Sequence, residues 1–194
     1  MIKFTLTLEG NNANGLLVHN SRLSNPLDPA AKELKKLTGK RNKTDEDYLN
    51  LARVEFAGGL YIDDVAGPYI PDQNIHRMLL DAGKLNKLGM KVTRGLFVES
   101  PINPIGYKGP RDEQGLWDAG FYNQSSVKNG TNRVMRTRPW FREWAVQADI
   151  AIDPSILDIR EVETIAANAG RFVGLGDWRP RFGRFNATIS DVSE

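Results

Sequence analysis

The sequence of 194 residues contains no cysteine and only two histidines, His19 and His76. The lack of cysteine excludes disulfide scaffolds, thiolate zinc sites and cysteine nucleophiles. Two histidines far apart in the sequence do not predict a histidine-rich metal site, so we expect no metal and no cofactor. No segment approaches the ~20 apolar residues of a membrane span, and the N-terminal MIKFTLTLEG lacks the continuous apolar core of a signal peptide. We therefore expect a cytoplasmic protein with no membrane partner.

The net charge is also small, at +2 from 26 Lys and Arg against 24 Asp and Glu. The overall balance therefore does not indicate a nucleic-acid-binding protein, and such a function would have to come from local clustering of charge. The length suits one domain.

The order of the expected elements indicates an α+β fold. Alternation of Ile2, Phe4, Leu6 and Leu8 with polar residues predicts a half-buried strand. Caps and periodicity predict helices at 26–37, 44–56, 71–89 (capped by Asp72) and 158–173. A hairpin is expected at 58–71 and a strand at 93–99. Two further strands, separated by Pro139, are expected within 132–153, and a last strand begins at 185. This frame is β-α-β-β-α-β, a ferredoxin-like or RRM-like antiparallel sheet with helices on one face. We predict one RRM-like domain over 1–194, with inserted helical and loop segments at about 26–57 and 100–130.

The stretch VGLGDWRPRFGRF (173–185) combines glycines, arginines and aromatic residues around a single carboxylate. Its glycines allow a tight backbone with exposed amides, its arginines offer planar forks suited to phosphates, and its tryptophan offers a stacking plane. It lacks the Gly-Lys-Ser/Thr ending of a Walker loop and the strand-to-helix context of a dinucleotide fingerprint. The alternative is a glycine-rich turn whose arginines pair with surface carboxylates. The candidate binding residues are Trp178, Arg179, Arg181 and Arg184.

A second basic stretch, KNGTNRVMRTRPWFR (128–142), lies in a region without acidic residues between Asp118 and Glu143. Arg136 and Arg138 are two positions apart on an expected strand, so they share a face. Cations interleaved with aromatic rings suit single-stranded nucleic acid, because charge contacts phosphates and rings stack on bases. The alternative is a solvated strand with its aromatic residues in the core. The candidate residues are Arg133, Arg136, Arg138, Arg142 and Trp140.

A third basic stretch, KLNKLGMKVTR (84–94), contributes Lys84, Lys87, Lys91 and Arg94 as a possible flank. A fourth, KELKKLTGKRNK (32–43), is lysine-rich. Such faces are usually only solvated, although a flexible basic loop can close over a bound strand.

The sequence offers little for catalysis. His19 follows the first strand and could serve as a general base that cleaves RNA, but a structural histidine is the commoner case. Asp63 and Asp64 are explained by a turn. We name no catalytic residue and no metal ligand, and we expect a protein that is not an enzyme.

Three stretches, in order, resemble motifs of the RAMP superfamily, the RRM-like proteins of CRISPR systems. GLGDWRPRFGRF (174–185) resembles the C-terminal glycine-rich motif of that superfamily. YIPDQNIHRML (69–79) is similar to the segment after its hairpin, and LTLEGNNANGLLVHN (6–20) is similar to its first strand and turn. The similarity is greatest to the backbone subunit of CRISPR effector complexes, which polymerises along single-stranded guide RNA. The chain also resembles phage-encoded proteins.

The resemblance implies an RRM-like sheet, a nucleic-acid groove beside the glycine-rich loop, and side-by-side assembly. With the basic stretches, it predicts a sequence-independent single-stranded nucleic-acid-binding protein that forms homo-oligomers or filaments along its strand. DNA is favoured over RNA because the resemblance to phage proteins points to replication or recombination. One alternative is a RAMP-type endoribonuclease that uses His19. Another is a phage inhibitor that imitates a CRISPR subunit and binds a host protein.

Overall fold

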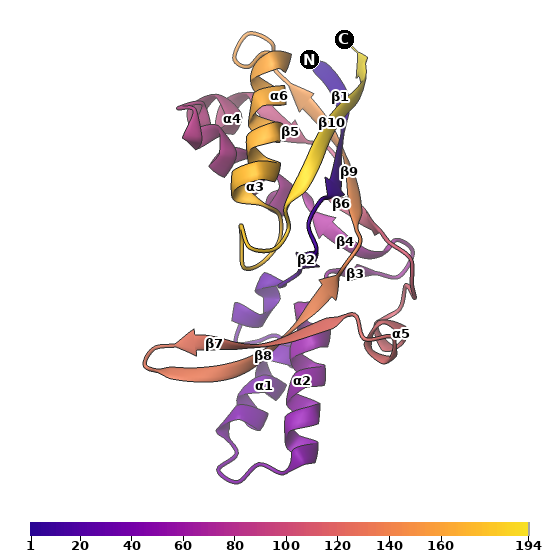
Figure 1. Cartoon of the computed structure of the whole chain (residues 1–194), viewed down its shortest axis with the longest axis vertical. Helices are drawn as coiled ribbons and strands as arrows, with labels where there is room; N and C mark the ends of the chain where they lie inside the picture. The colour runs from indigo at the N-terminus through magenta and orange to yellow at the C-terminus, as the bar shows by residue number, and fades with distance from the viewer. Residues whose placement is uncertain (194) are drawn as a thin grey trace.

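The computed structural model describes residues 1–193 and shows an α+β fold (Figure 1). Its larger sheet has the strand order β10-β1-β9-β6-β4-β3, and β5 also pairs with β9. All these pairings are antiparallel. The strands are β1 (Ile2–Gly10), β3 (Ile62–Asp63), β4 (Gly67–Pro71), β5 (Leu96–Val98), β6 (Ile102–Gly106), β9 (Ala145–Ile152) and β10 (Phe185–Ser193).

Four of these strands, in the spatial order β10-β1-β9-β5, form the predicted frame. The chain passes from β1 to β5 by way of α3 (Asp72–Leu85), and from β9 to β10 by way of α6 (Ile159–Asn168). Both helices lie on the same face of the sheet (Figure 1). This is the ferredoxin-like arrangement, so the predicted fold class is confirmed.

The alternation in β1 separates a core face from a solvent face, as expected. Phe4, Leu6 and Leu8 are buried in one cluster with the apolar residues of α3 and α6. On the opposite face, the Lys3 ammonium pairs with the Glu99 carboxylate at 2.9 Å. The open face of the sheet therefore carries polar and charged side chains, among them Thr5, whose hydroxyl donates to Asp149 at 3.2 Å. A short helix, α4 (Gly89–Gly95), and a π-helical turn, η2 (Ala169–Val173), complete the helical layer.

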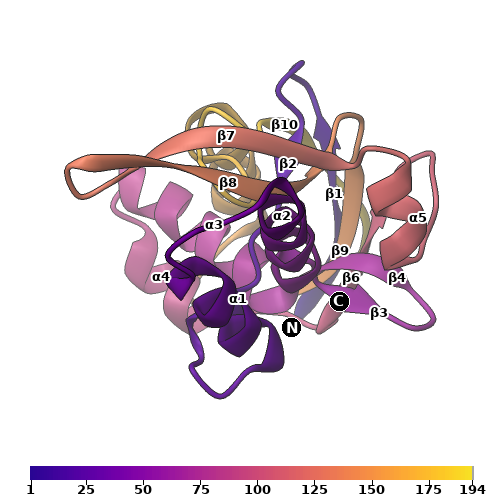
Figure 2. The same cartoon turned by 90° about the horizontal axis from the view of Figure 1, so that it is seen from below.

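A second sheet of order β2-β8-β7 is built from β2 (Leu16–Leu17), β7 (Tyr122–Asn129) and β8 (Asn132–Phe141). Strands β7 and β8 form a long ribbon that projects from the body of the molecule (Figures 1 and 2). Helices α1 (Pro29–Gly39) and α2 (Asp45–Gly59) extend beyond the ribbon, on the side away from the larger sheet (Figure 1). The helices outside the ferredoxin-like frame are η1 (Ser21–Ser24), α1 (Pro29–Gly39), α2 (Asp45–Gly59) and α5 (Glu113–Asp118).

Local signals set the starts of the inserted helices. The Asp28 side chain accepts hydrogen bonds from the first amides of α1, and Thr44 forms a capping box with Asp47 at the start of α2. Phe56 of α2 and Phe141 of β8 belong to the same buried cluster as the residues of β1. The inserted segments therefore share the core of the larger sheet.

Four local expectations are wrong. The N-cap of α3 is Pro71 without a side-chain hydrogen bond, so Asp72 does not cap this helix. The helix ends at Leu85 and α4 follows as a separate helix, because Lys87 has a left-handed φ of 61° that interrupts the helical path. Pro139 lies inside β8 rather than between two strands. The segment 100–130, expected as a loop excursion, contains β6, α5 and β7.

Candidate nucleic-acid interface

Strands β7 and β8, together with Asp177 and Trp178 of the glycine loop (residues 174–184), line a groove of about 550 Å³. We call it the ribbon groove. Arg136 and Arg138 both line it, as expected for residues two apart on one strand. The cations of the groove are Lys128, Arg133, Arg136 and Arg138.

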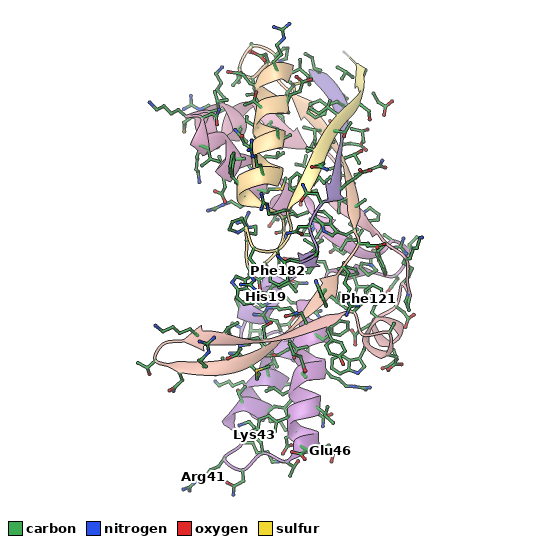
Figure 3. The ribbon with its side chains drawn as sticks, viewed as in Figure 1. His19, Arg41, Lys43, Glu46, Phe121 and Phe182 are labelled. Atoms are coloured by element: carbon green, nitrogen blue, oxygen red, sulfur yellow. The ribbon has the colours of Figure 1, made fainter. Side chains whose placement is uncertain are left out.

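Two smaller hollows adjoin the ribbon groove. The His19 hollow, of about 140 Å³, lies between the glycine loop and α3 and shares Asp177 with the groove. The α1 hollow, of about 310 Å³, shares Arg136 and Arg138 with the groove and His19 with the His19 hollow. Figure 3 shows His19 at the junction between the larger sheet and the ribbon.

We call the three adjoining hollows the basic track. The cations of the track are Lys35, Arg77, Lys128, Arg133, Arg136, Arg138 and Arg179. Its carboxylates, among residues 1–193, are Glu55 and Asp177. The linings of these hollows thus hold more cations than carboxylates, although the whole chain carries only +2.

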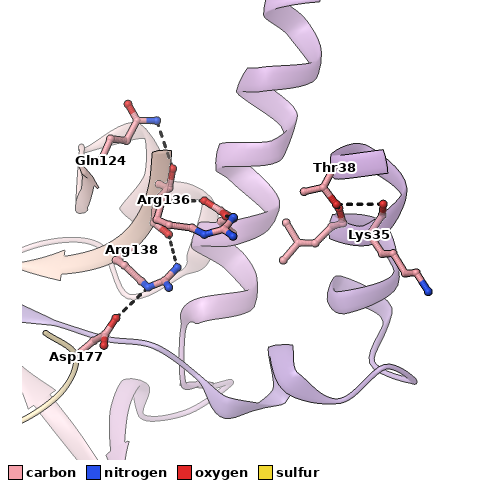
Figure 4. Close-up of polar contacts among 9 residues, drawn as sticks. Lys35, Thr38, Gln124, Arg136, Arg138 and Asp177 are labelled. Atoms are coloured by element: carbon pink, nitrogen blue, oxygen red, sulfur yellow. Dashed lines mark hydrogen bonds and ion pairs between the residues drawn. The ribbon is translucent and has the colours of Figure 1, made fainter. Parts of the chain in front are cut away.

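Two arginines of the track are held in ion pairs (Figure 4). Arg136 donates to Glu55 at 2.6 Å, and Arg138 donates to Asp177 at 3.0 Å. Arg136 and Arg138 are therefore not simply solvated, which was the alternative considered for this strand, whereas the alternative of a loop arginine paired with a carboxylate holds for Arg179, which lies 3.6 Å from Asp81. A guanidinium has five N–H donors, and both arginines still line the track, so each retains donors for a ligand.

Lys128 and Arg133, toward the tip of the ribbon, pair with no carboxylate in the part of the chain that the structure describes. Arg133 donates to the Ser126 hydroxyl at 3.1 Å. Both side chains are exposed. Their charge is therefore available to phosphates.

The glycine loop packs on β2 and on Gly15 just before it, and two backbone amides of the loop donate to carbonyl groups there. The Asp177 amide donates to the Leu17 carbonyl at 2.8 Å, and the Gly183 amide donates to the Gly15 carbonyl at 2.7 Å. Gly183 has φ +73°, and a Cβ on it would lie 1.7 Å from the Leu175 carbonyl oxygen. The expectation that the loop glycines expose their amides is wrong for Gly174 and Gly183, because the Gly174 amide donates to the Ala169 carbonyl and the Gly183 amide to the Gly15 carbonyl.

Trp178 is the aromatic residue of the track that is open to a ligand. Its residue surface is 44% exposed, and its backbone has a left-handed φ of 51°. The ring stacks on Phe182 with centroids 5.5 Å apart, and the Arg181 guanidinium lies 5.6 Å from the ring centroid. Phe182 and Arg181 therefore both lie against the ring, and close to half of the residue surface stays exposed.

The structure does not bring the three loop arginines to one point. Arg179 lines the His19 hollow and lies 3.6 Å from a carboxylate oxygen of Asp81. Arg181 covers Trp178, and Arg184 lines a separate hollow with Arg171. Only Arg179 of these three lines the basic track.

Other predicted residues also lie off the track. Arg142 stacks on Trp140 at 4.2 Å, and the Trp140 indole donates to the Asn14 carbonyl at 2.6 Å, so both are engaged within the protein. Lys84 pairs with Asp81 at 3.0 Å, and Lys91 pairs with Glu161 at 2.6 Å. The predicted flank Lys84, Lys87, Lys91 and Arg94 lines none of the three hollows.

His19 sits where the two smaller hollows meet. Burial lowers the pKa of His19 below its ordinary value of 6.5, and the nearby Arg138 guanidinium lowers this pKa further. Asp177 acts in the opposite direction. The Nδ1 atom is buried and has no hydrogen-bond partner among the described residues. The surroundings of the ring therefore favour its neutral form.

No protein-family model and no curated protein matches this sequence. The resemblance of its motifs to the RAMP superfamily therefore stays a prediction.

Within residues 1–193, no helix is long and apolar enough to cross a membrane. Over the same residues, no group of three or more His, Asp and Glu side chains is arranged to hold a metal ion.

Sequence reasoning missed several residues of the interface. Asn74 and Arg77 of α3 line the His19 hollow, and Asp81 pairs with Arg77. The i, i+3 and i+7 spacing of these three residues places them on one helix face, so the sequence could have predicted this polar face. Glu55 is a lone acid within the apolar ARVEFAGG end of α2, which is a signal for a buried, paired carboxylate. The sequence does not predict that Glu55 pairs with Arg136, because the two residues are 81 positions apart.

Proposed function

We propose that this protein binds single-stranded nucleic acid along the basic track without sequence preference and without catalysing a reaction. The observation that carries the proposal is the convergence of cations from α1, α3, the ribbon and the glycine loop on adjoining hollows. A phosphate backbone is a continuous polyanion and suits a continuous row of cations. The ion pairs of Arg136 and Arg138 orient these side chains toward the track and leave some of their donors free.

A single strand fits this surface better than a duplex does. The aromatic residue exposed in the ribbon groove offers a stacking plane, and only an unpaired strand presents the faces of its bases. The base-edge readout of a duplex uses a helix or ribbon inserted into a groove of the DNA. Here, the cations line a concave groove instead.

DNA is the polymer that we favour, because of the resemblance to phage-encoded proteins. The same resemblance is the basis for proposing that copies assemble side by side along the strand in the cytoplasm. The long ribbon that projects from the body (Figure 2) leaves its tip free to reach a neighbouring copy.

The test is a comparison of two variants with the same loss of charge. Lys128→Gln with Arg133→Gln removes the free cations of the ribbon groove. Lys87→Gln with Arg94→Gln removes two exposed cations off the track. Fluorescence anisotropy measures the affinity for single-stranded DNA, single-stranded RNA and duplex over a range of salt concentrations.

We expect the groove variant to bind the single strand more weakly, with a slope of log K against log [salt] reduced by about 1.4, from about 0.7 per lost phosphate contact. The second variant should match the wild type. Equal weakening by both variants would point to non-specific charge rather than the track, and absence of binding by the wild type would overturn the proposal. Electron microscopy of the complexes tests for filaments.

A second candidate function, RNA cleavage, is favoured by one observation. His19 lies where burial favours its neutral form and lines a hollow with two arginines, as a general base beside a phosphate would. Incubation of labelled RNA with wild type and with His19→Ala decides between the two candidates. Cleavage that the variant loses supports an endoribonuclease, and intact RNA in both samples supports the binding function.

A further inference from the structure

The His19 hollow is the smallest of the three hollows of the track, at about 140 Å³. Its wall contains side chains that match a phosphate group. Arg77 and Arg179 provide guanidinium donors, Asn74 provides an amide, and His19 provides one edge of its ring. The volume suits a phosphate group and is small for a base with its sugar.

The two arginines of this hollow are only partly neutralised. Arg77 pairs with Asp81 at 2.9 Å, while Arg179 approaches the same carboxylate at 3.6 Å. One carboxylate therefore serves two guanidinium groups, and the longer contact is weak. The carboxylate of Asp177, which also lines the hollow, is held by Arg138 at 3.0 Å. The hollow thus keeps a net positive charge.

His19 faces charged groups from each element packed around it. The cations are Arg136 and Arg138 of β8, Arg77 of α3, Arg179 of the glycine loop and Lys35 of α1. The carboxylates are Asp177 of the glycine loop, Glu55 of α2 and, behind Arg77 and Arg179, Asp81 of α3, and each is already in an ion pair. The cations outnumber the carboxylates, so a proton on His19 lacks a counter-ion within the free protein.

We propose that the His19 hollow holds one phosphate group of the bound strand, and that His19 takes up a proton from solvent as this phosphate enters. The inference rests on the proposed function, since the phosphate belongs to the strand. An anion among these cations supplies the missing counter-charge and favours the imidazolium form. By linkage, the strand is then bound more tightly as pH falls.

The first experiment uses the two histidines of the chain as a matched pair. The affinity for labelled oligothymidine is measured from about pH 8 to about pH 5.5 at fixed salt for wild type, His19→Gln and His76→Gln, across the range where histidine titrates. We expect affinity to rise by at least about tenfold for wild type and for His76→Gln. It should stay nearly flat for His19→Gln.

The second experiment uses the two flanking arginines of the glycine loop. Arg179→Gln removes a cation of the hollow, whereas Arg184→Gln removes one from the separate hollow near β10. Ring NMR signals of His19 and His76 are followed against pH with no ligand, with oligothymidine, and with inorganic phosphate. We expect the strand to raise the pKa of His19 in wild type and in Arg184→Gln, but not in Arg179→Gln, with His76 unchanged throughout.

These outcomes separate this inference from the proposed function. In one outcome, the strand binds, the Lys128 and Arg133 variant binds it more weakly, and affinity rises with falling pH equally in both histidine variants. This outcome supports binding along the basic track and contradicts the phosphate subsite. If inorganic phosphate raises the pKa of His19 while no oligonucleotide binds, the hollow takes an anion but the strand proposal fails. A His19 signal unmoved by either ligand overturns the inference outright.

Discussion

The carboxylate of Glu55 joins the inserted helix α2 to the ribbon by holding Arg136 at 2.6 Å and accepting the Thr137 amide at 2.8 Å. The Glu55 side chain is only 5% exposed, against 30% for Arg136. The pair therefore stabilises the packing of α2 on β8, and it also neutralises one cation of the basic track. The contact therefore favours the stability of the fold but opposes binding of a strand by Arg136.

Glu55→Gln should separate these two effects. Loss of the charge leaves Arg136 without its counter-ion, so we expect the free energy of unfolding to fall by about 1–3 kcal/mol. The released guanidinium should strengthen strand binding and steepen the salt dependence, by about 0.7 in slope if it gains one phosphate contact. Urea denaturation and anisotropy titrations measure the two quantities.

The matched control for this change is Glu163→Gln, which removes an exposed carboxylate of α6 away from the track. It should leave stability within about 0.5 kcal/mol of wild type and leave the affinity nearly unchanged. If Glu55→Gln binds the strand no better than Glu163→Gln, Arg136 does not face the strand.

Trp178 gives a prediction in which binding changes and stability does not. Trp178→Gly removes the exposed ring and places glycine at φ 51°, a conformation that glycine adopts readily. We expect the midpoint of thermal unfolding to stay close to that of wild type. Strand binding should weaken by about 1–3 kcal/mol for each base that stacks on the ring.

Trp178→Phe is the companion variant, because it keeps an aromatic plane at the same position. It should retain most of the affinity that Trp178→Gly loses. A glycine variant that binds as tightly as wild type would remove Trp178 from the interface.

The frame of the fold was predictable because its signals are local. The alternation of Phe4, Leu6 and Leu8 predicts which face of β1 is buried, and the Asp28 cap predicts where the inserted helix α1 begins. These signals act within a few residues of one another. They therefore survive in the sequence without knowledge of the tertiary structure.

The interface was only partly predictable, because its decisive contacts join distant positions. The sequence shows that Arg136 and Arg138 share a face, but not that Glu55 and Asp177 neutralise part of their charge. It predicts flexible glycines at 174–184, but not that amides of this loop donate hydrogen bonds to carbonyl groups in and next to β2. The basic segment 84–94 has the composition of a binding flank, yet the fold places it away from the three hollows.

The role of the glycine loop as a packing element can be tested at Gly183. A Cβ on this residue would lie 1.7 Å from the Leu175 carbonyl oxygen, so Gly183→Ala forces backbone to move in addition to straining a left-handed residue. We expect at least about 3 kcal/mol of destabilisation, measured by urea denaturation.

Gly120→Ala isolates the backbone part of this cost. Gly120 has a similar φ of +75°, but nothing lies within 4 Å of an added Cβ. It should cost about 1–2 kcal/mol, the strain of a left-handed alanine alone. Equal losses for the two variants would mean that the loop relaxes freely and does not depend on close packing against its neighbours.

The last prediction concerns the free protein and the proton on His19. Burial lowers the pKa of His19 below 6.5 in the folded state, so the unfolded chain binds this proton more readily. The contribution of His19 to stability is therefore constant above about pH 6.5 and declines as pH falls toward the folded-state pKa. The hydrogen bond from Lys40 lowers the pKa of Asp47 to about 2, so that carboxyl group does not titrate in this window.

Thermal unfolding between about pH 8 and about pH 5 measures this effect, since histidine titrates within that range. We expect the unfolding midpoint to fall with pH in wild type and His76→Gln, and to fall less in His19→Gln. A bound strand should oppose the decline, because its phosphate stabilises the protonated ring that burial alone disfavours. If His76→Gln rather than His19→Gln flattens the profile, the histidine that senses pH lies on α3 and not in the basic track.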